Sequence, residues 1–481
     1  MKRRSFLKIG LSTVTGSLVL PSVSFSKAGA LIPVPPFKIS LAQWSLNKGF
    51  FGRVNPKLDP LDFAKIAHSL GIDGLEYVNQ FFKDKAKDRS YLAELKKRAN
   101  GYGCRSLLIM CDGEGNLGDP DNGKRTQAVE NHVKWLEAAK YLGCHSIRVN
   151  AHSRGSFETQ QKSIIDGLGR LCQKGQGYGL NVIVENHGGL SSDPEWLTGV
   201  MDGVGLPNVG TLPDFGNFGE HDPYQGVESL MPYARGVSAK AAFKSDGSCS
   251  TVNYSQMMRI VRDFGWDGYV GIESGASGGH SEMEAIRLTK SLLEEAQNHW
   301  TKTPAILGDS LQGWRKIEGG DWTLRNGVLT GKNGRNWTTN PEVSGSWLYL
   351  DTPVKDFVFE FQYMINERGN SGVLFRSKLE KNPSFTGYEM QITASQNPTP
   401  NKKGTPGAVY DFVTPTKNVA RQPGQWNTVT IKGVGANITI EMNREKIVDA
   451  KLDRSLEGYI GFQNHDQRSV VKFKNVRLQM L

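Results

Sequence analysis

Three carboxylates stand at the ends of apolar runs in the first part of the chain. Glu185 lies in NVIVENHGG, Asp214 in NVGTLPDFGNFG and Glu273 in GYVGIESG. An ionised acid at the end of a buried strand is costly unless a cation or a substrate compensates its charge. Three such acids in series therefore predict a divalent-metal site or an acid/base site.

The elements that must position these acids alternate regularly between Phe37 and about Leu293. Eight strand-like runs are separated by amphipathic helical segments such as NHVKWLEAAKYLGC. The runs are KISLAQW, GLEYV, RSLLIMC, SIRVNAH, NVIVEN, NVGTLPDF, GVSAKA and YVGIES. Eight strand–helix units over roughly 260 residues are typical of a closed (β/α)₈ TIM barrel, whose sites lie at the C-terminal ends of the strands. We expect the three acids to meet at that rim.

The pattern changes after the last barrel helix, where Pro304 and Gly308 mark a linker. From Gly313 onward, short alternating runs such as FVFEFQYMI, SGVLFRS and NITIEMN dominate. They predict an all-β sandwich of the jelly-roll kind. The fold class is therefore multidomain, a TIM barrel followed by a jelly roll. The predicted segments are a signal (1–30), the barrel (31–298), a linker (299–312) and the jelly roll (313–481).

Composition excludes several function classes. The formal charge of the 481 residues is +10, but residues 1–30 hold five cations without an acid, and the rest of the excess is dispersed. Without a basic run or a nucleic-acid motif, we expect no nucleic-acid partner. The cysteines have no metal-ligand spacing, which predicts buried free thiols rather than a disulfide framework. They are Cys104, Cys111, Cys144, Cys172 and Cys249.

The N-terminus has the features of an export signal. Arg3-Arg4-Ser5-Phe6-Leu7-Lys8 has a twin-arginine pattern, an apolar stretch runs to Leu20, and Ala28-Gly29-Ala30 provides a small-residue cleavage site. The stretch is too short for a stable membrane anchor. We therefore predict a periplasmic or secreted protein that is free of the membrane after cleavage. The alternative is an amphipathic N-terminal helix of the mature fold.

The barrel segments WLEAAKYLGCHSIRVNA, ENH, DFGNFG and GIES resemble the xylose isomerase-like TIM-barrel family of sugar phosphate isomerases and epimerases, over roughly residues 37–295. The resemblance implies one divalent metal (Mg, Mn or Co, or else Zn) held by Glu185, Asp214 and Glu273. It also implies that Glu185 and Glu273 act as catalytic acid and base.

One position departs from the family pattern. Ser238 stands where the family has a histidine ligand, and Lys240 follows two residues later. Three alternatives remain open. The metal site is weaker, or it recruits His187 or Asn217, or it holds no metal and Lys240 balances the acids as a catalytic cation.

Other polar side chains on these strands are expected to line the same rim. Arg148 and His152 have the same parity on the fourth strand, and His187 has the parity of Glu185, so all three are candidate sugar-binding residues. A purely structural role stays open for His152. Glu76 is assigned either a rim contact or a capping role. Trp44 either stacks on a sugar or fills the barrel bottom, which we favour.

The second domain resembles the 3-keto-disaccharide hydrolase family through GWRKIEGGDWTLRNGVLTG, NSGVLFRS, GYEMQI, GQWNTVTI and GYIGFQNHD. Polar residues within its apolar strands are candidates for chemistry. Arg376 is a candidate cation for a keto or enolate oxygen, and Glu389 or His465 a candidate base. Gln391 and Asn464 are candidate substrate contacts. The alternative is carbohydrate binding without catalysis, because jelly rolls often serve as lectins.

Together the two resemblances imply a small carbohydrate as substrate. The first hypothesis is a periplasmic enzyme that cleaves 3-keto-glycosides by proton abstraction, elimination and hydration, a net hydrolysis with a metal-dependent acid/base site in the barrel. The second is a metal-dependent sugar isomerase or epimerase whose β-domain only binds glycans. The third is a noncatalytic glycan-binding protein. The oligomeric state stays open.

Overall fold

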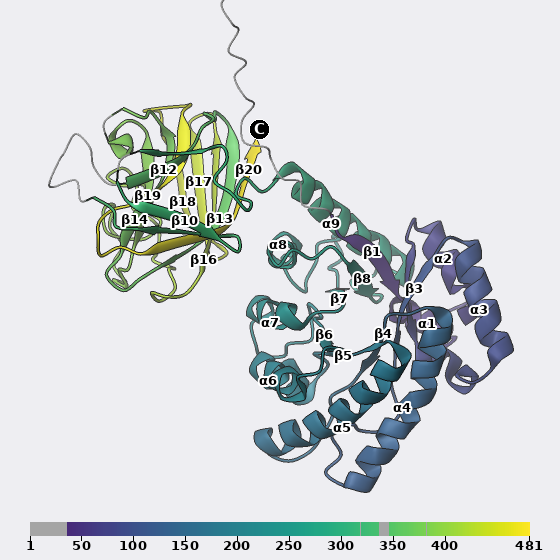
Figure 1. Cartoon of the computed structure of the whole chain (residues 1–481). Helices are drawn as coiled ribbons and strands as arrows, with labels where there is room; N and C mark the ends of the chain where they lie inside the picture. The colour runs from purple at the N-terminus through teal and green to yellow at the C-terminus, as the bar shows by residue number, and fades with distance from the viewer. Residues whose placement is uncertain (1–35, 318, 336–345, 381) are drawn as a thin grey trace, which may run out of the picture.

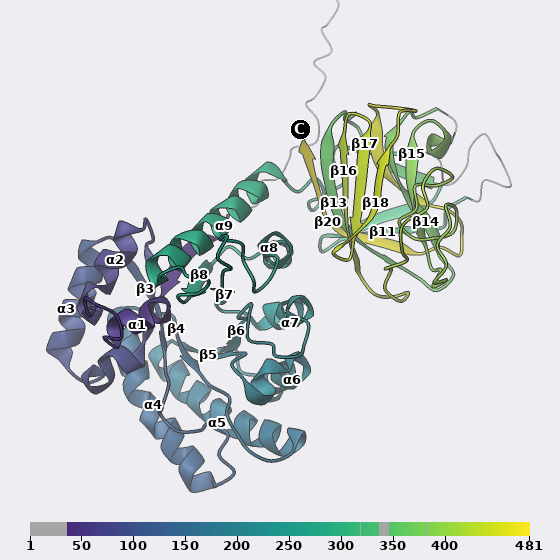
Figure 2. The ribbon, with the colours of Figure 1, turned by 180° about the vertical axis from the view of Figure 1, so that it is seen from behind.

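The computed structural model describes residues 36–317, 319–335, 346–380 and 382–481. Two bodies lie side by side, an α/β barrel and a β-sandwich, and the chain passes from one to the other at the end of a long helix, α9 (Glu282–Lys302) (Figures 1 and 2). The multidomain fold predicted from the sequence is confirmed.

Eight parallel strands form the barrel, in the order β6-β5-β4-β3-β2-β1-β8-β7. Bridges from Thr211 to Ala234 and from Asp214 to Ser238 join the β6 side to the β7 side and close the cylinder. All eight predicted runs form strands. They are β1 (Lys38–Ala42), β2 (Gly74–Val78), β3 (Arg105–Met110), β4 (Ser146–Val149), β5 (Asn181–Glu185), β6 (Val209–Leu212), β7 (Val237–Ala241) and β8 (Tyr269–Ser274).

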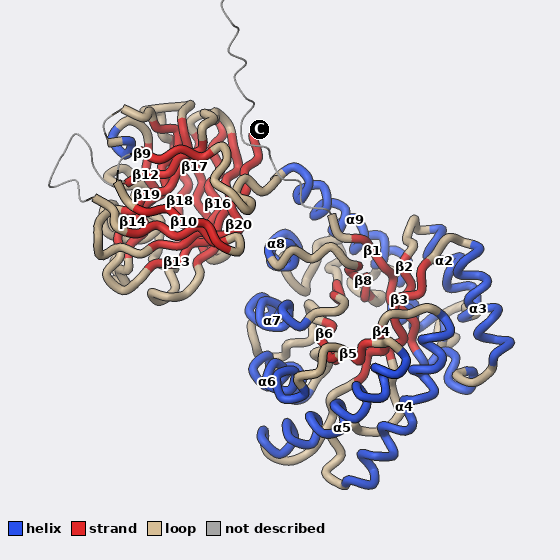
Figure 3. The backbone as a smooth tube through the Cα atoms, in the orientation of Figure 1, coloured by secondary structure: helices blue, strands red, loops and turns tan. Residues whose placement is uncertain are grey.

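Helices surround these strands on the outside (Figure 3). Local sequence defines their ends: Asp121 and Ser156 accept hydrogen bonds as N-caps, while Gly143 and Gly179 adopt the left-handed conformation after the last turn. The longer helices before α9 are α2 (Phe63–Ser69), α3 (Arg89–Gly101), α4 (Asn122–Leu142), α5 (Phe157–Tyr178), α6 (Pro194–Val204), α7 (Pro223–Leu230) and α8 (Tyr254–Asp263).

An apolar cluster fills the inside of the barrel. It consists of Ala42, Val78, Leu108, Met110, Ile183 and Leu212. Successive strand residues point to opposite faces, so the residue two positions after an inward one also points inward. Glu185 follows Ile183 and Asp214 follows Leu212, and both acids therefore continue the inward-facing rows beyond the apolar layer.

The sandwich has a seven-stranded sheet, in the order β10-β11-β20-β13-β16-β17-β18, and a five-stranded sheet, in the order β15-β14-β19-β12-β9. Asn326 and Gly327, both at positive φ, make the tight turn between β10 and β11. The strands are β9 (Trp314–Ile317), β10 (Asp321–Arg325), β11 (Val328–Lys332), β12 (Ser346–Leu350), β13 (Phe357–Ile365), β14 (Asn370–Ser377), β15 (Tyr388–Thr393), β16 (Asn427–Val434), β17 (Asn437–Met442), β18 (Glu445–Lys451), β19 (Tyr459–Asn464) and β20 (Val471–Met480).

Strands β9 and β18 were not among the predicted runs. Both carry several charged side chains, and the burial pattern of β18 shows that few of its residues reach the core. Helix α9 also extends to Lys302, into the segment predicted as a linker. Periodicity detects an element poorly when little of it is buried, and helix ends are the least certain feature of a pattern.

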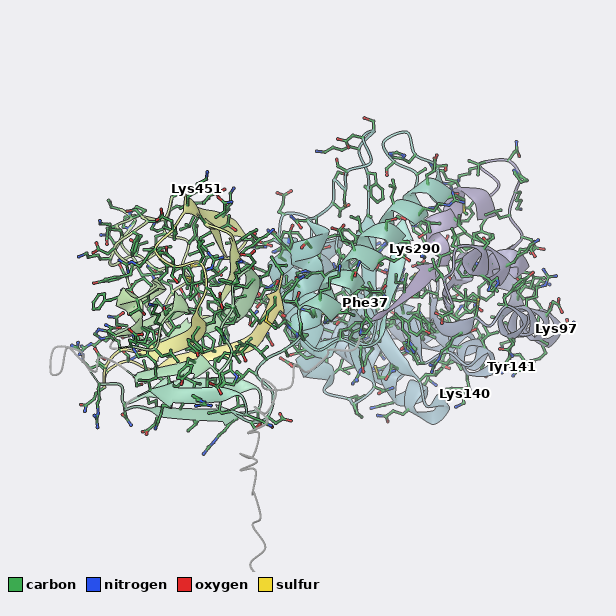
Figure 4. All side chains as sticks on the ribbon, turned by 90° about the horizontal axis from the view of Figure 1, so that it is seen from above. Phe37, Lys97, Lys140, Tyr141, Lys290 and Lys451 are labelled. Carbon is green, nitrogen blue, oxygen red and sulfur yellow. The ribbon has the colours of Figure 1, made fainter. Side chains whose placement is uncertain are left out.

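Ion pairs connect the two bodies. Arg262 of α8 lies 2.5 Å from Glu360 of β13, and Arg444 of the sandwich lies 2.7 Å from Asp222 at the start of α7. Figure 4 shows the two bodies from above, with Lys97 and Lys140 on the barrel side that is remote from the sandwich and Lys451 on the sandwich.

The cysteine prediction is confirmed, since all five thiols are free and only Cys249 is incompletely buried. Among the described helices, none combines the length and apolar character that crossing a membrane requires. The predicted signal, residues 1–30, lies outside the described residues.

Candidate active site

The three acids predicted from the sequence converge at the C-terminal end of the barrel. Glu185 ends β5, Asp214 follows β6 and Glu273 lies near the end of β8. One carboxylate oxygen from each lies within 4.8 Å of the others, and all three side chains are buried. The strand order explains this arrangement, because the C-terminal ends of the parallel strands of a closed barrel meet at one rim.

Two cations from neighbouring strands lie against these acids. The Nζ of Lys240 on β7 lies 2.7 Å from Glu273 Oε1 and 3.7 Å from Asp214 Oδ2. The Nε of Arg148 on β4 lies 2.9 Å from Glu185 Oε2. The guanidinium of Arg148 also pairs with Asp112 at 2.9 Å. The predicted cationic role of Lys240 beside the acids therefore agrees with its position.

Hydrogen bonds hold the acids in place. The Ser238 hydroxyl donates to Asp214 Oδ2 at 2.8 Å, and the backbone N–H of Gly216 donates to Asp214 Oδ1 at 2.8 Å. The Asn217 amide donates to Glu185 Oε1 at 3.0 Å. Ser238 thus supports an acid from the place where the resemblance implies a metal-ligating histidine.

Burial and neighbouring charges give the three acids different pKa values. Burial raises the pKa of Glu185 to about 7, although Arg148 opposes this rise. Burial also raises the pKa of Asp214 to about 7 against the effect of Lys240. The pKa of Glu273 is lowered, because the charge and hydrogen bond of Lys240 outweigh the effect of its burial. At neutral pH the site therefore contains an ionised Glu273 beside two acids that can hold a proton.

The oxygen donors of the three acids suit a hard divalent cation, and their spacing brings them within reach of one ion. The remaining residues fit such an ion poorly. Lys240 Nζ already lies against both Glu273 and Asp214. The position at which the resemblance implies a histidine ligand holds Ser238, whose hydroxyl is bonded to Asp214. An ion between these acids requires Lys240 to move away.

The other predicted barrel residues surround this cluster. Arg148 is buried within it, whereas His152 and His187 are exposed in the loops after β4 and β5. Partial burial lowers the pKa of each imidazole, and Arg148 lowers the pKa of both further. Neutral imidazoles in these loops can donate to and accept from sugar hydroxyls.

The expectation for Glu76 and the favoured position of Trp44 at the barrel bottom were wrong. Glu76 lies inside the barrel, accepts a 2.6 Å hydrogen bond from Ser40 and lines a cavity with Lys38 and Trp266, close to the N-terminal ends of the strands. A side chain on Gly271 would collide with the Glu76 carboxylate. Trp44 follows the C-terminal end of β1 and stacks on Phe81, with ring centroids 6.1 Å apart, so it does not fill the barrel bottom.

A second polar site lies in the sandwich, where loops cover one face of the five-stranded sheet. Its cavity of about 710 Å³ is large enough for a sugar. Three of the predicted residues, Glu389, Gln391 and His465, line it. The other lining residues are Asn370, Asn382, Ser384, Phe385, Asn401, Lys403, Gly404, Tyr410, Asp411 and Gln463.

Several buried polar atoms of this cavity have no hydrogen-bond partner within the described protein. They are Asn370 Oδ1, Gln463 Oε1 and His465 Nδ1, although His465 Nδ1 lies 3.5 Å from an Asp466 oxygen. Burial raises the pKa of Glu389 to about 7, and the Ser384 hydroxyl opposes the rise. Unpartnered buried polar atoms are uncommon in proteins and mark places where a polar ligand gains affinity.

Two predicted residues do not reach this cavity. The Arg376 guanidinium donates to the backbone carbonyls of Lys355 and Gly435, and it lies 3.3 Å from Asp356. The Asn464 amide donates to the carbonyls of Gly331 and Ser469. Both side chains are buried and bonded to backbone, so the roles predicted for Arg376 in catalysis and for Asn464 in substrate binding are not supported.

The sequence reasoning overlooked other residues. Asp112, which pairs with Arg148, lies two residues after the last residue of β3. Like the three predicted acids it follows an apolar run, so the same pattern could have identified it. Asn370 and Gln463 had a weaker signal: Asn370 begins β14, and Gln463 is the next-to-last residue of β19. Tyr410 and Asn401 come from a long loop and had none.

Comparison with protein families identifies both domains. Residues 64–298 match the model of the xylose isomerase-like TIM barrel, and residues 302–479 match that of the 3-keto-alpha-glucoside-1,2-lyase-like domain. The chain therefore combines these two domain types, as the sequence motifs predicted. No curated relative matches the chain.

Solved structures resemble the two domains separately. The 3-keto-D-glucoside 4-epimerase of E. coli is 17% identical over 54% of this chain and 99% of its own, with a TM-score of 0.44. A xylose isomerase-like TIM barrel protein from Mycobacterium smegmatis in complex with magnesium is 15% identical over 55% and 98%, with a TM-score of 0.43. A putative glycosyl hydrolase from Parabacteroides distasonis is 24% identical over 36% and 90%, with a TM-score of 0.30.

Proposed function

We propose that this protein cleaves 3-keto-glycosides by proton abstraction, elimination and hydration, so that the net reaction is hydrolysis. The observation that carries the proposal is the barrel cluster, in which an ionised Glu273, two acids of raised pKa and the cation of Lys240 share one buried site. A carbonyl at C3 of the sugar acidifies the hydrogen at C2, and acid/base chemistry at that carbon needs these groups.

Glu273 is the proposed base. Its pKa is lowered, so it is ionised at neutral pH and can accept the proton from C2. The electrons of the broken C2–H bond pass into the carbonyl and form an enolate. Lys240 lies beside Glu273 and carries a positive charge, because its acidic neighbours outweigh burial and raise its pKa. We assign it to the developing enolate oxygen.

Glu185 is the proposed acid. Its raised pKa of about 7 leaves it partly protonated at neutral pH. When the enolate re-forms the carbonyl, the C1–O bond breaks, and the departing glycosidic oxygen takes a proton from Glu185. Glu185, now ionised, takes a proton from water as the water oxygen adds to C1 of the enone, and Glu273 returns its proton to C2, so both groups regain their starting states. We assign His152 and His187, exposed in the loops after β4 and β5, to the binding of sugar hydroxyls at the rim.

The sandwich cavity is proposed as a carbohydrate site. Its unpartnered amide and imidazole atoms match the donors and acceptors of a sugar, and Glu389 adds a carboxyl that burial keeps partly protonated near pH 7. These polar atoms equally favour a second candidate, a sugar isomerase or epimerase whose β-domain only binds glycans. In both candidates the barrel acids carry the proton transfers.

The deciding experiment compares two substrates that differ only in oxidation at C3. Purified protein is incubated with a nitrophenyl 3-keto-glucoside and with the parent glucoside. Release of nitrophenol from the keto compound alone supports the proposal. Interconversion of free ketoses and aldoses, without release, supports the isomerase. If neither occurs although sugars bind, the protein is a noncatalytic glycan-binding protein.

We also propose a periplasmic or secreted location, which rests on the twin-arginine pattern at Arg3-Arg4 and the cleavage motif at Ala28-Gly29-Ala30. Cell fractionation of the expressed full chain tests this, together with an Arg3→Lys/Arg4→Lys variant that should stay in the cytoplasm.

A further inference from the structure

The barrel acids already have protein partners on most of their oxygens. At least five of the six carboxylate oxygens of Glu185, Asp214 and Glu273 face a donor or a cation of the chain. A metal ion must replace such partners with its own bonds, and it gains least where the partners are charged and buried.

The charges of the cluster are also largely compensated. Its three carboxylates carry up to three negative charges, and Arg148 and Lys240 offset two of them. Lys240 is the critical group, because its Nζ touches Glu273 and lies 3.7 Å from Asp214, between two of the three candidate ligands. An ammonium group at that place repels a second cation at short range.

Ser238 provides no metal ligand in place of the histidine. Its hydroxyl donates to Asp214 Oδ2, so it orients an acid, and it supplies no imidazole nitrogen. Ser238 and Lys240 have the same parity on β7, and both therefore point into the barrel. One strand thus provides a hydrogen bond and a fixed positive charge to the acids.

We infer that Lys240 is the resident cation of this acid cluster and that it excludes divalent metals. The charge that a metal would supply to the acids and to the substrate oxygen comes from an ammonium group built into β7. The role of Lys240 toward the substrate rests on the proposed function, whereas the exclusion of metal does not.

The test measures metal binding directly. The purified full-length protein is treated with a chelator, dialysed and titrated with Mn²⁺. Free Mn²⁺ is followed by electron paramagnetic resonance. The wild type is compared with Lys240→Met and Lys240→Gln, which remove the charge, and with Lys240→Arg, which keeps it. Ser238→His/Lys240→Met adds the missing ligand. Thermal unfolding verifies that each variant is folded.

We expect the wild type and Lys240→Arg to bind Mn²⁺ weakly, and the neutral variants to bind at least about ten-fold more tightly because the repulsion is gone. The double variant should bind most tightly. Stoichiometric, micromolar binding by the wild type overturns the inference, as does an unchanged or weaker affinity in both neutral variants. Because two neutral variants are made, the test can still be read if one of them misfolds.

This readout is independent of turnover. If the wild type excludes Mn²⁺ but releases no nitrophenol from the keto-glucoside, the proposed function fails and the inference about Lys240 stands. If it releases nitrophenol only when loaded with Mn²⁺, the inference fails and the proposed function stands.

Discussion

Buried carboxyl groups serve the barrel and the sandwich in different ways. In the barrel, the acids lie close together and each has charged or hydrogen-bonding partners, chiefly Arg148, Lys240 and Ser238. In the sandwich, Glu389 is a buried acid in a cavity of about 710 Å³ whose wall carries unpartnered polar atoms. The barrel site is organised internally, whereas the sandwich site depends on a ligand to satisfy its polar groups.

The difference shows that burial alone does not determine the state of an acid. Burial is the largest influence on the pKa of both Glu273 and Glu389, and it acts in the same direction on each. The pKa of Glu273 is nevertheless lowered by Lys240, while that of Glu389 rises to about 7. A neighbouring cation therefore decides which acid is ionised and able to act as a base.

The largest expected effect is a loss of kcat when the barrel site, but not the sandwich site, is changed. Glu185→Gln removes the proposed acid, and we expect keto-glucoside cleavage to fall by about 10²- to 10⁴-fold in kcat. Glu389→Gln should mainly raise KM. Steady-state kinetics on both variants checks this. Glu282→Gln is the control, since that buried carboxylate accepts backbone N–H bonds from Lys48 and Gly49 and lies outside the acid cluster. Equal losses of kcat in the Glu185 and Glu389 variants would contradict the division of roles.

A second prediction concerns the buried ion pair between Arg262 and Glu360, one of those that link the two regions. Burial raises the pKa of Glu360, but the charges of Arg259 and Arg262 and the hydrogen bond with His299 outweigh it and hold that pKa well below its ordinary value. Glu360→Gln should lower the free energy of unfolding at pH 7 by about 3 kcal/mol, because it leaves Arg262 poorly compensated. Urea unfolding measures the loss.

The pH dependence of this pair has a definite sign. Its contribution is fully present above the ordinary carboxyl pKa and is lost as the pH falls through the depressed pKa of Glu360. The difference between the wild type and Glu360→Gln should therefore shrink in acid. Asp449→Asn, which breaks the exposed pair with Lys446, should cost under about 1 kcal/mol and serves as the control. Equal costs for the two variants would refute the role given to burial.

The third prediction tests the buried acid of the sandwich cavity, Glu389. Because the pKa of Glu389 rises from 4.5 to about 7, the folded state binds its proton more tightly than the unfolded state does. Its contribution to the free energy of unfolding should fall as the pH rises from about 4.5 to 7, by up to about 3 kcal/mol. Urea unfolding of the wild type and Glu389→Gln at pH 5 and pH 8 checks the difference. A wild type that gains stability relative to the variant at pH 8 would rule out a protonated Glu389.

The smallest effect concerns the shape of the same cavity. A methyl group on Gly372 would lie 1.9 Å from Glu389 Oε1, so Gly372→Ala should displace the carboxyl group. We expect sugar binding to weaken by about ten-fold, which lies within the range of about 1–3 kcal/mol typical of overpacking. Isothermal titration with a keto-sugar measures the affinity. In a Glu389→Ala background the same change should have little effect. A full effect there would mean that the methyl group acts on another part of the site.

The sequence predicted most of the fold because its signals are local. Apolar runs such as NVIVEN and capping residues such as Asp121 depend only on near neighbours in the chain, and every predicted barrel strand formed. The strand ends also predicted the meeting of Glu185, Asp214 and Glu273, since a closed barrel brings those ends to one rim.

By itself, the sequence determined which side chains face inward and where three acids gather. Only the tertiary structure decided how each charge is compensated: Arg148 against Glu185, Lys240 against Glu273, and Arg376 turned to backbone carbonyls away from the sandwich cavity. Side-chain direction repeats with a short period along a strand, so a linear pattern records it. Electrostatic partners come from separate strands and act through space over a few ångströms, and no linear pattern contains those distances.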